Sequence, residues 1–368
     1  MIEKIKIENL TVFEDLEIDT NAPINVFIGE NGTGKTQILR FIYLVLLYED
    51  KEILTPEETD FLSGIIKAYS FHIEGKRGNE EEELARLEPL RKKVLPSDED
   101  VGNLAKKADN WFKQTQFLNR NHINTNNLHR NEELNHGDFT IEFSDNNDLV
   151  KDFVFIPAKD MLTHSKGLPE MKKEYGNNMP FDETYIHIIE KAKKWNKKDI
   201  PEIAKNVLPI LEDIMDGIVK IVNDVFYIQK RSGQMIPFDF EAEGIKKIGL
   251  LWQLLMNGSI TKGTVLLWDE PETNINPTLS PIIANMLLEL SRSGVQIFLT
   301  THSYFLAKYF DILEKEKGEV VFHSLYREDE NKEKPVICET SDTFSMLANN
   351  DIIDEKIRIY KTEMEWEF

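Results

Sequence analysis

The stretch VFIGENGTGKTQILRF, from Val26 to Phe41, constrains the fold more than any other part of the chain. It opens with apolar residues, as a buried strand does. It leads into a run from Gln37 to Tyr48 that is apolar nearly all round, as in a buried helix. The turn between them fits G-x-x-x-x-G-K-[ST] at every position. A strand, a glycine-rich turn and a helix in this order predict a phosphate-binding loop in an α/β fold.

Each residue type in this loop has a chemical reason. Glycines let backbone N–H groups converge on phosphate oxygens, Lys35 can reach β- and γ-phosphates, and the Thr36 hydroxyl can ligate Mg²⁺. The candidate nucleotide ligands are Gly29, Glu30, Asn31, Gly32, Thr33, Gly34, Lys35 and Thr36.

Two further apolar runs end in polar residues, as buried parallel strands do. In VLLWDEP, Asp269 is a candidate for orienting Mg²⁺ through its water shell, and Glu270 is a candidate for polarising an attacking water. In IFLTTHS, one predicted helix and one predicted strand later, His302 can hydrogen-bond a γ-phosphate and hold Glu270 or the water.

The composition favours a folded protein with protein partners. With 368 residues and 41% hydrophobic content the chain can build a full core, and no apolar run is long enough for a membrane span. A single cysteine, Cys338, excludes an internal disulfide and fits the cytoplasm. The net charge of -21 disfavours direct binding of nucleic acid.

One basic run, KAKKWNKK from Lys191 to Lys198, leaves two interpretations open. Its tryptophan and lysines could stack a base and hold phosphates. Such a run is more often the solvated face of a helix.

We divide the chain into three parts. Residues 1–160 form the N-terminal part of the core, with a peripheral insertion at about 50–136. Residues 161–235 form a helical lobe, and residues 236–368 complete the core. His122, His129 and His136 recur in the insertion, where a solvated helix or loop is favoured over a metal site.

GENGTGKT, LLWDEPETNINP and FLTTHS together resemble the motifs of ABC-type ATPases. The resemblance is closer to the branch that contains SMC, RecF and overcoming-lysogenisation (OLD) proteins. Within it, the chain looks like small stand-alone bacterial ATPases of anti-phage and toxin-linked operons. The fold that this implies is α/β: a P-loop ABC-type nucleotide-binding domain with an inserted helical lobe, and ATP and Mg²⁺ as cofactors.

The resemblance also implies roles for residues. Asp269 looks like the Walker B aspartate, Glu270 like the catalytic glutamate and His302 like the switch histidine. Glu272 to Pro277 resemble the D-loop, which contacts the other subunit, here with Asn274 and Asn276 as candidate nucleotide contacts. Ala242 to Gly244 stand where the ABC signature belongs, with Glu243 and Gly244 as candidate ligands, although the usual serine is missing. The segment at the Q-loop position has no glutamine. Either Lys159 or Asp160 replaces it as a contact to the nucleotide or to a metal-bound water, or the segment is a plain structural turn.

From this resemblance we expect a homodimer with ATP held between two subunits and hydrolysed by in-line attack of water, with Lys35, Glu270 and His302 as catalytic residues. One hypothesis is a regulatory or scaffold subunit that controls an effector, a nuclease or toxin encoded nearby. The alternative is a DNA-repair or DNA-transaction ATPase that binds DNA directly. A transporter subunit is disfavoured by the inserted lobe and the missing serine.

Overall fold

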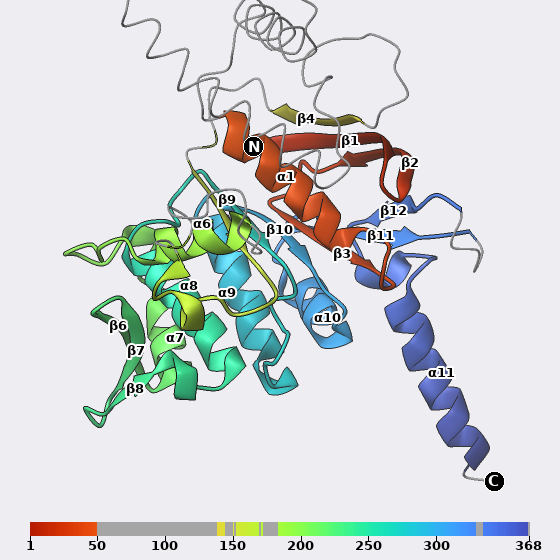
Figure 1. Ribbon diagram of the computed structural model, residues 1–368. Coiled ribbons are helices and arrows are strands. Elements are labelled where there is room, and N and C mark those ends of the chain that lie inside the picture. The colour runs from red at the N-terminus through yellow and green to blue at the C-terminus, as the bar shows by residue number, and fades with distance from the viewer. Residues whose placement is uncertain are drawn as a thin grey trace, which may run out of the picture. The chain divides into compact units, whose positions relative to one another are not determined.

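The computed structural model describes residues 1–49, 138–143, 150, 152–168, 171, 183–328 and 334–366 (Figure 1). The chain divides into two compact units, Met1–Tyr43 with Gly137–Phe368, and Leu44–His136. The predicted insertion at about 50–136, with its three histidines, lies outside the described residues. The described strands and the glycine-rich loop all belong to the first unit.

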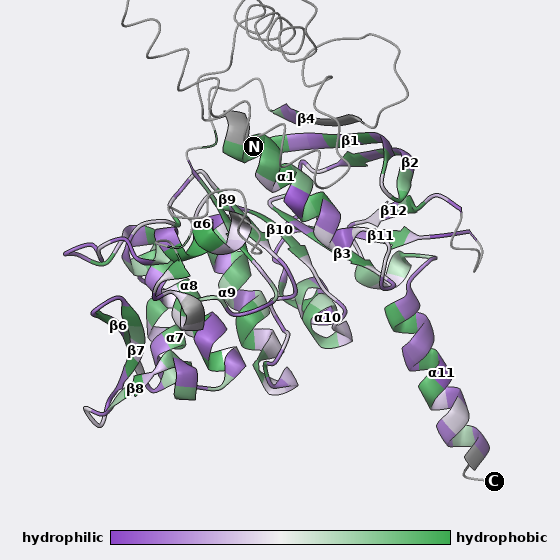
Figure 2. Ribbon diagram, in the orientation of Figure 1, coloured by the Kyte–Doolittle hydropathy of each residue, from purple (hydrophilic) through white to green (hydrophobic). Residues whose placement is uncertain are grey.

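The largest sheet in the described part of the chain has six strands, in the order β12-β11-β3-β10-β9-β5. Neighbouring strands from β11 to β5 run parallel, and only the edge strand β12 is antiparallel to its neighbour. Every residue of β3, β9 and β10 is buried, as expected for parallel strands covered on both faces. Most residues of these strands are hydrophobic (Figure 2). The strand bounds are β3 Ile24–Gly29, β5 Asp152–Ile156, β9 Thr264–Trp268, β10 Gln296–Thr300, β11 Val320–Tyr326 and β12 Ile337–Ser341. The predicted α/β class with a parallel sheet is confirmed.

A second, antiparallel sheet of three strands has the order β2-β1-β4. Its strands are β1 Ile2–Leu10, β2 Phe13–Asp19 and β4 Asp138–Phe143. The buried carboxamide of Gln296 ties this sheet to β10, since it accepts the N–H of Ile2 at 2.8 Å and donates to the carbonyl of Ile2 at 2.8 Å.

Helices bury the apolar side chains of the large sheet. They are α1 Lys35–Glu49, α6 Glu183–Ala192, α7 Leu208–Met215, α8 Glu243–Met256, α9 Ser280–Arg292, α10 Tyr304–Leu313 and the terminal α11 Asp351–Trp366. The predicted helix after the glycine-rich turn is α1, and its buried residues include Ile38, Leu39 and Ile42. None of the described helices is both long enough and apolar enough to cross a bilayer.

The expectation that residues 161–235 form a helical lobe is wrong for the part that follows α7. After α7 the chain forms three antiparallel strands, β6 Gly217–Val222, β7 Val225–Lys230 and β8 Met235–Pro237. Asp216 adopts a left-handed conformation at φ 51° and ends α7. Asn223 and Asp224 then have φ 51° and 63°, the signs that a two-residue hairpin turn requires. The lobe is therefore a mixture of helices and a small sheet.

Candidate nucleotide site

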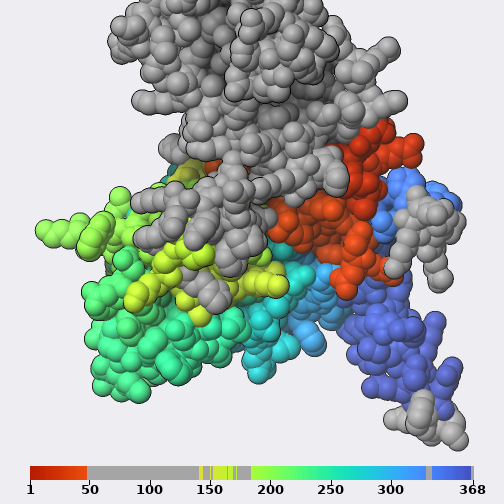
Figure 3. Space-filling model, in the orientation of Figure 1, coloured from red at the N-terminus to blue at the C-terminus, as the bar shows by residue number. Residues whose placement is uncertain are grey.

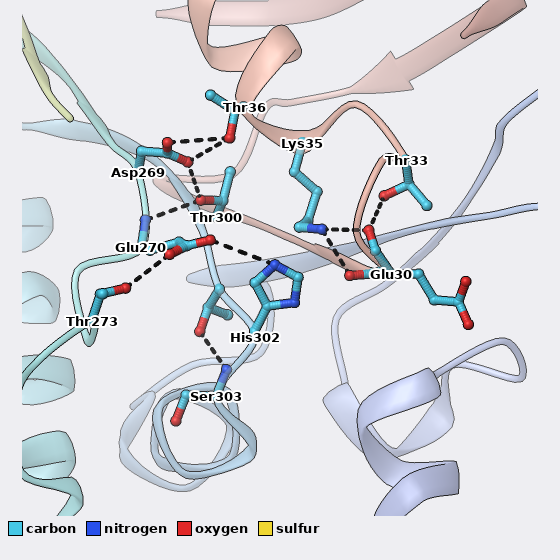
Figure 4. A network of polar contacts seen from close by, with 12 residues as sticks. Glu30, Thr33, Lys35, Thr36, Asp269, Glu270, Thr273, Thr300, His302 and Ser303 are labelled. Carbon is cyan, nitrogen blue, oxygen red and sulfur yellow. Dashed lines mark hydrogen bonds and ion pairs between the residues drawn. The ribbon is translucent and has the colours of Figure 1, made fainter. Parts of the chain in front are cut away.

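The order of the large sheet brings three loops together. The carboxyl end of β10 lies between those of β3 and β9, because β10 pairs with both strands in parallel. The glycine-rich loop follows β3, Asp269 and Glu270 follow β9, and His302 follows β10. The predicted candidates from distant parts of the sequence therefore share one edge of the sheet (Figure 4).

Two positions in the glycine-rich loop require glycine. Gly29 has φ +136°, and an added Cβ would lie 2.1 Å from the carbonyl oxygen of Leu325 on β11. Gly34 has φ +92°, and a Cβ there would lie 2.4 Å from the ring of Phe13. The loop is thus packed between β11 and the start of β2, and α1 begins at Lys35. The first N–H groups of a helix have no partner within the helix and can bind an anion.

Lys35 lies folded into the loop. Its ammonium donates to the carbonyl oxygens of Gly29 at 2.8 Å and Glu30 at 2.7 Å. Burial lowers the pKa of Lys35 to about 8, and the carboxylates of Glu270 and Asp269 counteract part of that shift. A bound polyphosphate would supply the negative charge that stabilises the charged form.

Thr36 and Asp269, the two predicted Mg²⁺ ligands, touch each other. The Thr36 hydroxyl lies 2.9 and 3.1 Å from the two carboxylate oxygens of Asp269, which is 7% exposed. Thr300 at the end of β10 donates to Asp269 at 2.7 Å and accepts the backbone N–H of Glu270 at 3.0 Å. Thr300 therefore links the two carboxylate residues, a role that the sequence did not reveal.

Glu270 adopts a left-handed backbone conformation, with φ 48°. Its carboxylate accepts the hydroxyl of Thr273 at 2.9 Å, and its backbone carbonyl accepts the ammonium of Lys247 at 2.8 Å. Lys247 is 4% exposed, and burial lowers its pKa against the opposing effect of nearby Glu272 and Glu270. Contacts from Thr300, Thr273 and Lys247 thus fix the orientation of Glu270.

His302 lies beside Glu270, with its Nε2 3.6 Å from a carboxylate oxygen (Figure 4). Burial, with a further contribution from the charge of Lys35, lowers the pKa of His302 below its usual 6.5, which favours the neutral ring. The backbone N–H of His302 donates to Glu272 at 3.0 Å, and the hydroxyl of Thr301 donates to the same oxygen at 2.7 Å. Burial raises the pKa of Glu272.

The signature-like segment lies at the start of α8. A Cβ on Gly244 would lie 2.6 Å from the carbonyl oxygen of Asn274, so this helix start packs closely on residues 272–277 of its own chain. Glu243 pairs with Lys246 at 2.7 Å. The side-chain oxygen of Asn276 accepts the N–H of Thr278 at 3.0 Å and so caps the next turn.

Two predicted contacts have local roles in this structure. Glu272, predicted within a loop that contacts another subunit, turns its carboxylate onto Thr301 and His302 of its own chain. Asp160 accepts the N–H groups of Leu162 at 3.0 Å and Thr163 at 3.3 Å, contacts that form a local turn after β5.

The basic run is not one continuous surface. Lys191 is 5% exposed and pairs with Asp152 at 2.5 Å, whereas Trp195 is 94% exposed. The loop after α6 is held by the buried Gln253 of α8, whose carboxamide donates to the carbonyl of Ala192 at 2.9 Å. The fixed loop projects at the left of the space-filling view (Figure 3).

Residues 24–308 match the family model described as "AAA domain, putative AbiEii toxin, Type IV TA system". The chain belongs to this AAA family. The match begins at β3 and runs past His302, so it contains all three loops of the site.

Shorter similarities reach curated proteins. A stretch of 46 residues is 50% identical to the DNA double-strand break repair Rad50 ATPase of Methanopyrus kandleri. This stretch covers 12% of this chain and 5% of that protein. A stretch of 72 residues is 32% identical to the DNA replication and repair protein RecF of Streptococcus suis, 18% of this chain and 20% of that protein. The chain thus spans a fifth or less of these relatives. The predicted resemblance to the SMC- and RecF-like branch of ABC-type ATPases is confirmed.

Solved structures with a similar backbone arrangement include an Smc head domain from Pyrococcus furiosus bound to the C-terminal domain of ScpA. Its TM-score is 0.40 at 10% identity, over 99% of both chains. An ATP-binding cassette of an ABC transporter in its ADP conformation has a TM-score of 0.39 at 12% identity, over 97% of this chain and 99% of that chain.

Proposed function

We propose that this chain binds ATP with Mg²⁺, hydrolyses it, and uses the change of nucleotide state to control a partner effector. The observation that carries the proposal is the convergence of Thr36, Asp269 and Glu270 beside the glycine-rich loop. The Thr36 hydroxyl lies 2.9 Å from Asp269, and Glu270 is the next residue along the chain.

The donor set fits Mg²⁺ and a nucleoside triphosphate. A hydroxyl and a carboxylate are oxygen ligands of the kind that Mg²⁺ prefers, and Thr36 and Asp269 would hold the ion. When bound, Mg²⁺ neutralises charge on the phosphate oxygens. The Lys35 ammonium would exchange its carbonyl contacts for phosphate oxygens, and the N–H groups at the start of α1 would complete the cradle.

The chain's own residues can position the attacking water. Thr273 fixes one oxygen of Glu270, which leaves the other, Oε1, to orient a water and accept its proton. The neutral ring of His302 lies next to that oxygen and can donate a hydrogen bond to the γ-phosphate or to the water. Lys247 and Thr300 hold the backbone of Glu270 from both sides.

We further propose that two copies enclose the nucleotides. The start of α8 and residues 272–277 pack together in one chain, and they form a joint surface for the ATP of a second copy. Gly244 and the neighbouring Asn274 and Asn276 would supply its contacts. The missing signature serine predicts slow hydrolysis.

The output of this ATPase would belong to a partner, a nuclease or toxin, in defence against phage. The family description, which names a toxin and a toxin–antitoxin system, and the net charge of -21 support a protein partner over nucleic acid. The test is to purify tagged Glu270→Gln from its host. A stoichiometric protein encoded nearby, with little nucleic acid, is expected. Nuclease-sensitive DNA without a protein would contradict the effector role.

A second candidate is a DNA-transaction ATPase. The fixed and 94% exposed Trp195, with lysines on both sides, favours it, as do the repair functions in the names of the short-stretch relatives. This candidate predicts hydrolysis that DNA stimulates and that falls steeply with salt. In that case Trp195→Ala would abolish the stimulation and leave the basal rate unchanged.

A further inference from the structure

We infer that α11 is an interface between copies of this chain, in which two α11 helices pair antiparallel without nucleotide. This surface is separate from the nucleotide-sandwiching contact proposed above. Figure 1 and Figure 3 show α11, in blue at the lower right, leaving the body of the first unit. The helix runs from Asp351 to Trp366.

An apolar stripe follows α11 outward from the core. Ile353, Ile357, Tyr360 and Met364 recur at alternating steps of four and three residues, which places them on one side of a helix. Ile353 packs against the core, whereas Ile357 is 45%, Tyr360 56% and Met364 68% exposed. The side that packs on the body thus continues for two more turns, along which the apolar side chains are about half exposed or more. An apolar stripe at heptad spacing is the seam by which helices pair.

The charges beside the stripe select the occupant and its direction. Asp354 and Lys361 are exposed on one side of it, and Lys356 and Glu363 lie on the other. In an antiparallel pair with Ile357 opposite the partner's Tyr360, Asp354 lies beside the partner's Lys361. The two-fold symmetry repeats that contact. In a parallel pair Lys356 would face the partner's Lys361, a like-charge contact.

The attractive Asp354–Lys361 contact is what favours the antiparallel direction, whereas Lys356 already has a contact within its own chain. Its ammonium lies 3.6 Å from the centroid of the Tyr304 ring. Asp354 and Lys361 complement themselves across a two-fold axis, which is a property of a surface that meets its own copy. A second copy is therefore the occupant that this surface fits.

The test is sedimentation of the full chain without nucleotide, up to about 100 μM protein. The wild type is expected to dimerise, and Ile357→Asp to be monomeric. Lys361→Asp turns two attractive contacts into repulsive ones and should weaken dimerisation about 10-fold. Combining it with Asp354→Lys exchanges the two charges and should restore the wild-type dimer.

The matched control is Arg358→Asp, which makes the same change of charge away from the stripe and should leave dimerisation unchanged. Circular dichroism checks that each variant is folded. A wild type that stays monomeric, a dimer that survives Ile357→Asp, or an exchanged pair that fails to recover from Lys361→Asp would each overturn the inference.

Discussion

At the scale of single residues, the site depends on the orientation of Glu270. A non-glycine residue at φ 48° is held by its surroundings, and here the partners are Thr300, Thr273 and Lys247. Lys247 is the least expected of them, because a buried lysine that binds a backbone carbonyl leaves no signature in a sequence.

We predict that Lys247→Met lowers kcat about 10- to 100-fold with little change in ATP affinity, because it releases Glu270 and leaves the phosphate contacts intact. Single-turnover hydrolysis and equilibrium binding of a fluorescent ATP analogue separate the two effects. The matched control is Lys191→Met, which removes another buried lysine, paired with Asp152 at 2.5 Å at the start of β5. Equal losses in both variants would show a general effect on stability instead.

A second prediction concerns Lys35, whose pKa is lowered to about 8 without nucleotide. ATP binds the charged ammonium, so binding takes up a proton above that pH. ATP affinity should fall about 10-fold between pH 7 and pH 9, and Lys35→Arg, which stays charged, should lose this dependence. The same lowered pKa makes the nucleotide-free fold gain stability as pH rises from 8 towards 10.5. An ATP affinity that does not change between pH 7 and pH 9 would contradict the role of the Lys35 ammonium in binding ATP.

Sequence reasoning could identify Lys35, Thr36, Asp269 and Glu270 because each follows a buried strand in a fixed chemical pattern. It could not identify Thr300 or Glu272 as organising residues. Their importance arises from the order β3-β10-β9, which places the end of β10 between the other two loops. That order is a property of the assembled sheet and is not written in any local pattern.

At the scale of elements, the buried strands β3, β9 and β10 and the helix α1 could be predicted from their apolar runs, whereas the β6–β7 hairpin could not. The run from Ile203 to Phe226 is rich in aliphatic residues that suit either a helix or a strand. The decision is made by Asp216, Asn223 and Asp224, which adopt positive φ angles. Asn and Asp accept such angles more readily than most residues, so these positions were the available signal.

The close packing of α8 on residues 272–277 gives a third prediction. Gly244→Ala places a methyl group 2.6 Å from the carbonyl oxygen of Asn274, so the loop or the helix must shift. We expect a loss of about 1–3 kcal/mol in the free energy of unfolding, measured by urea denaturation. An unchanged stability would show that the loop moves freely relative to α8.

At the scale of the whole molecule, the residues that match the family model do not include every strand of the large sheet. The match ends at residue 308, yet β11 at Val320–Tyr326 completes the large sheet beside β3. The carbonyl of Leu325 forms one wall of the glycine-rich loop, where a Cβ on Gly29 would lie 2.1 Å away. The segment after the match is therefore a structural part of the site.

This arrangement predicts the outcome of truncation. Ending the chain after Lys317 removes β11 and should abolish ATP binding, because the loop loses its wall. Ending it after Asp354 keeps Ile352 and Ile353, which pack on the core, and should retain ATP binding. Both can be measured by equilibrium binding after a check of folding by circular dichroism. Retained binding in the shorter chain would contradict this role of β11.

The measurement that tests the central claim most directly is phosphate release from ATP and Mg²⁺ by the purified wild type, Glu270→Gln and Lys35→Ala, alongside ATP binding by each. We predict that the wild type releases phosphate. Glu270→Gln should bind ATP but release phosphate at a rate lower by about 100-fold or more, and Lys35→Ala should bind weakly. A Glu270→Gln variant that hydrolyses ATP as fast as the wild type, or a wild type that does not bind ATP, would contradict the claim.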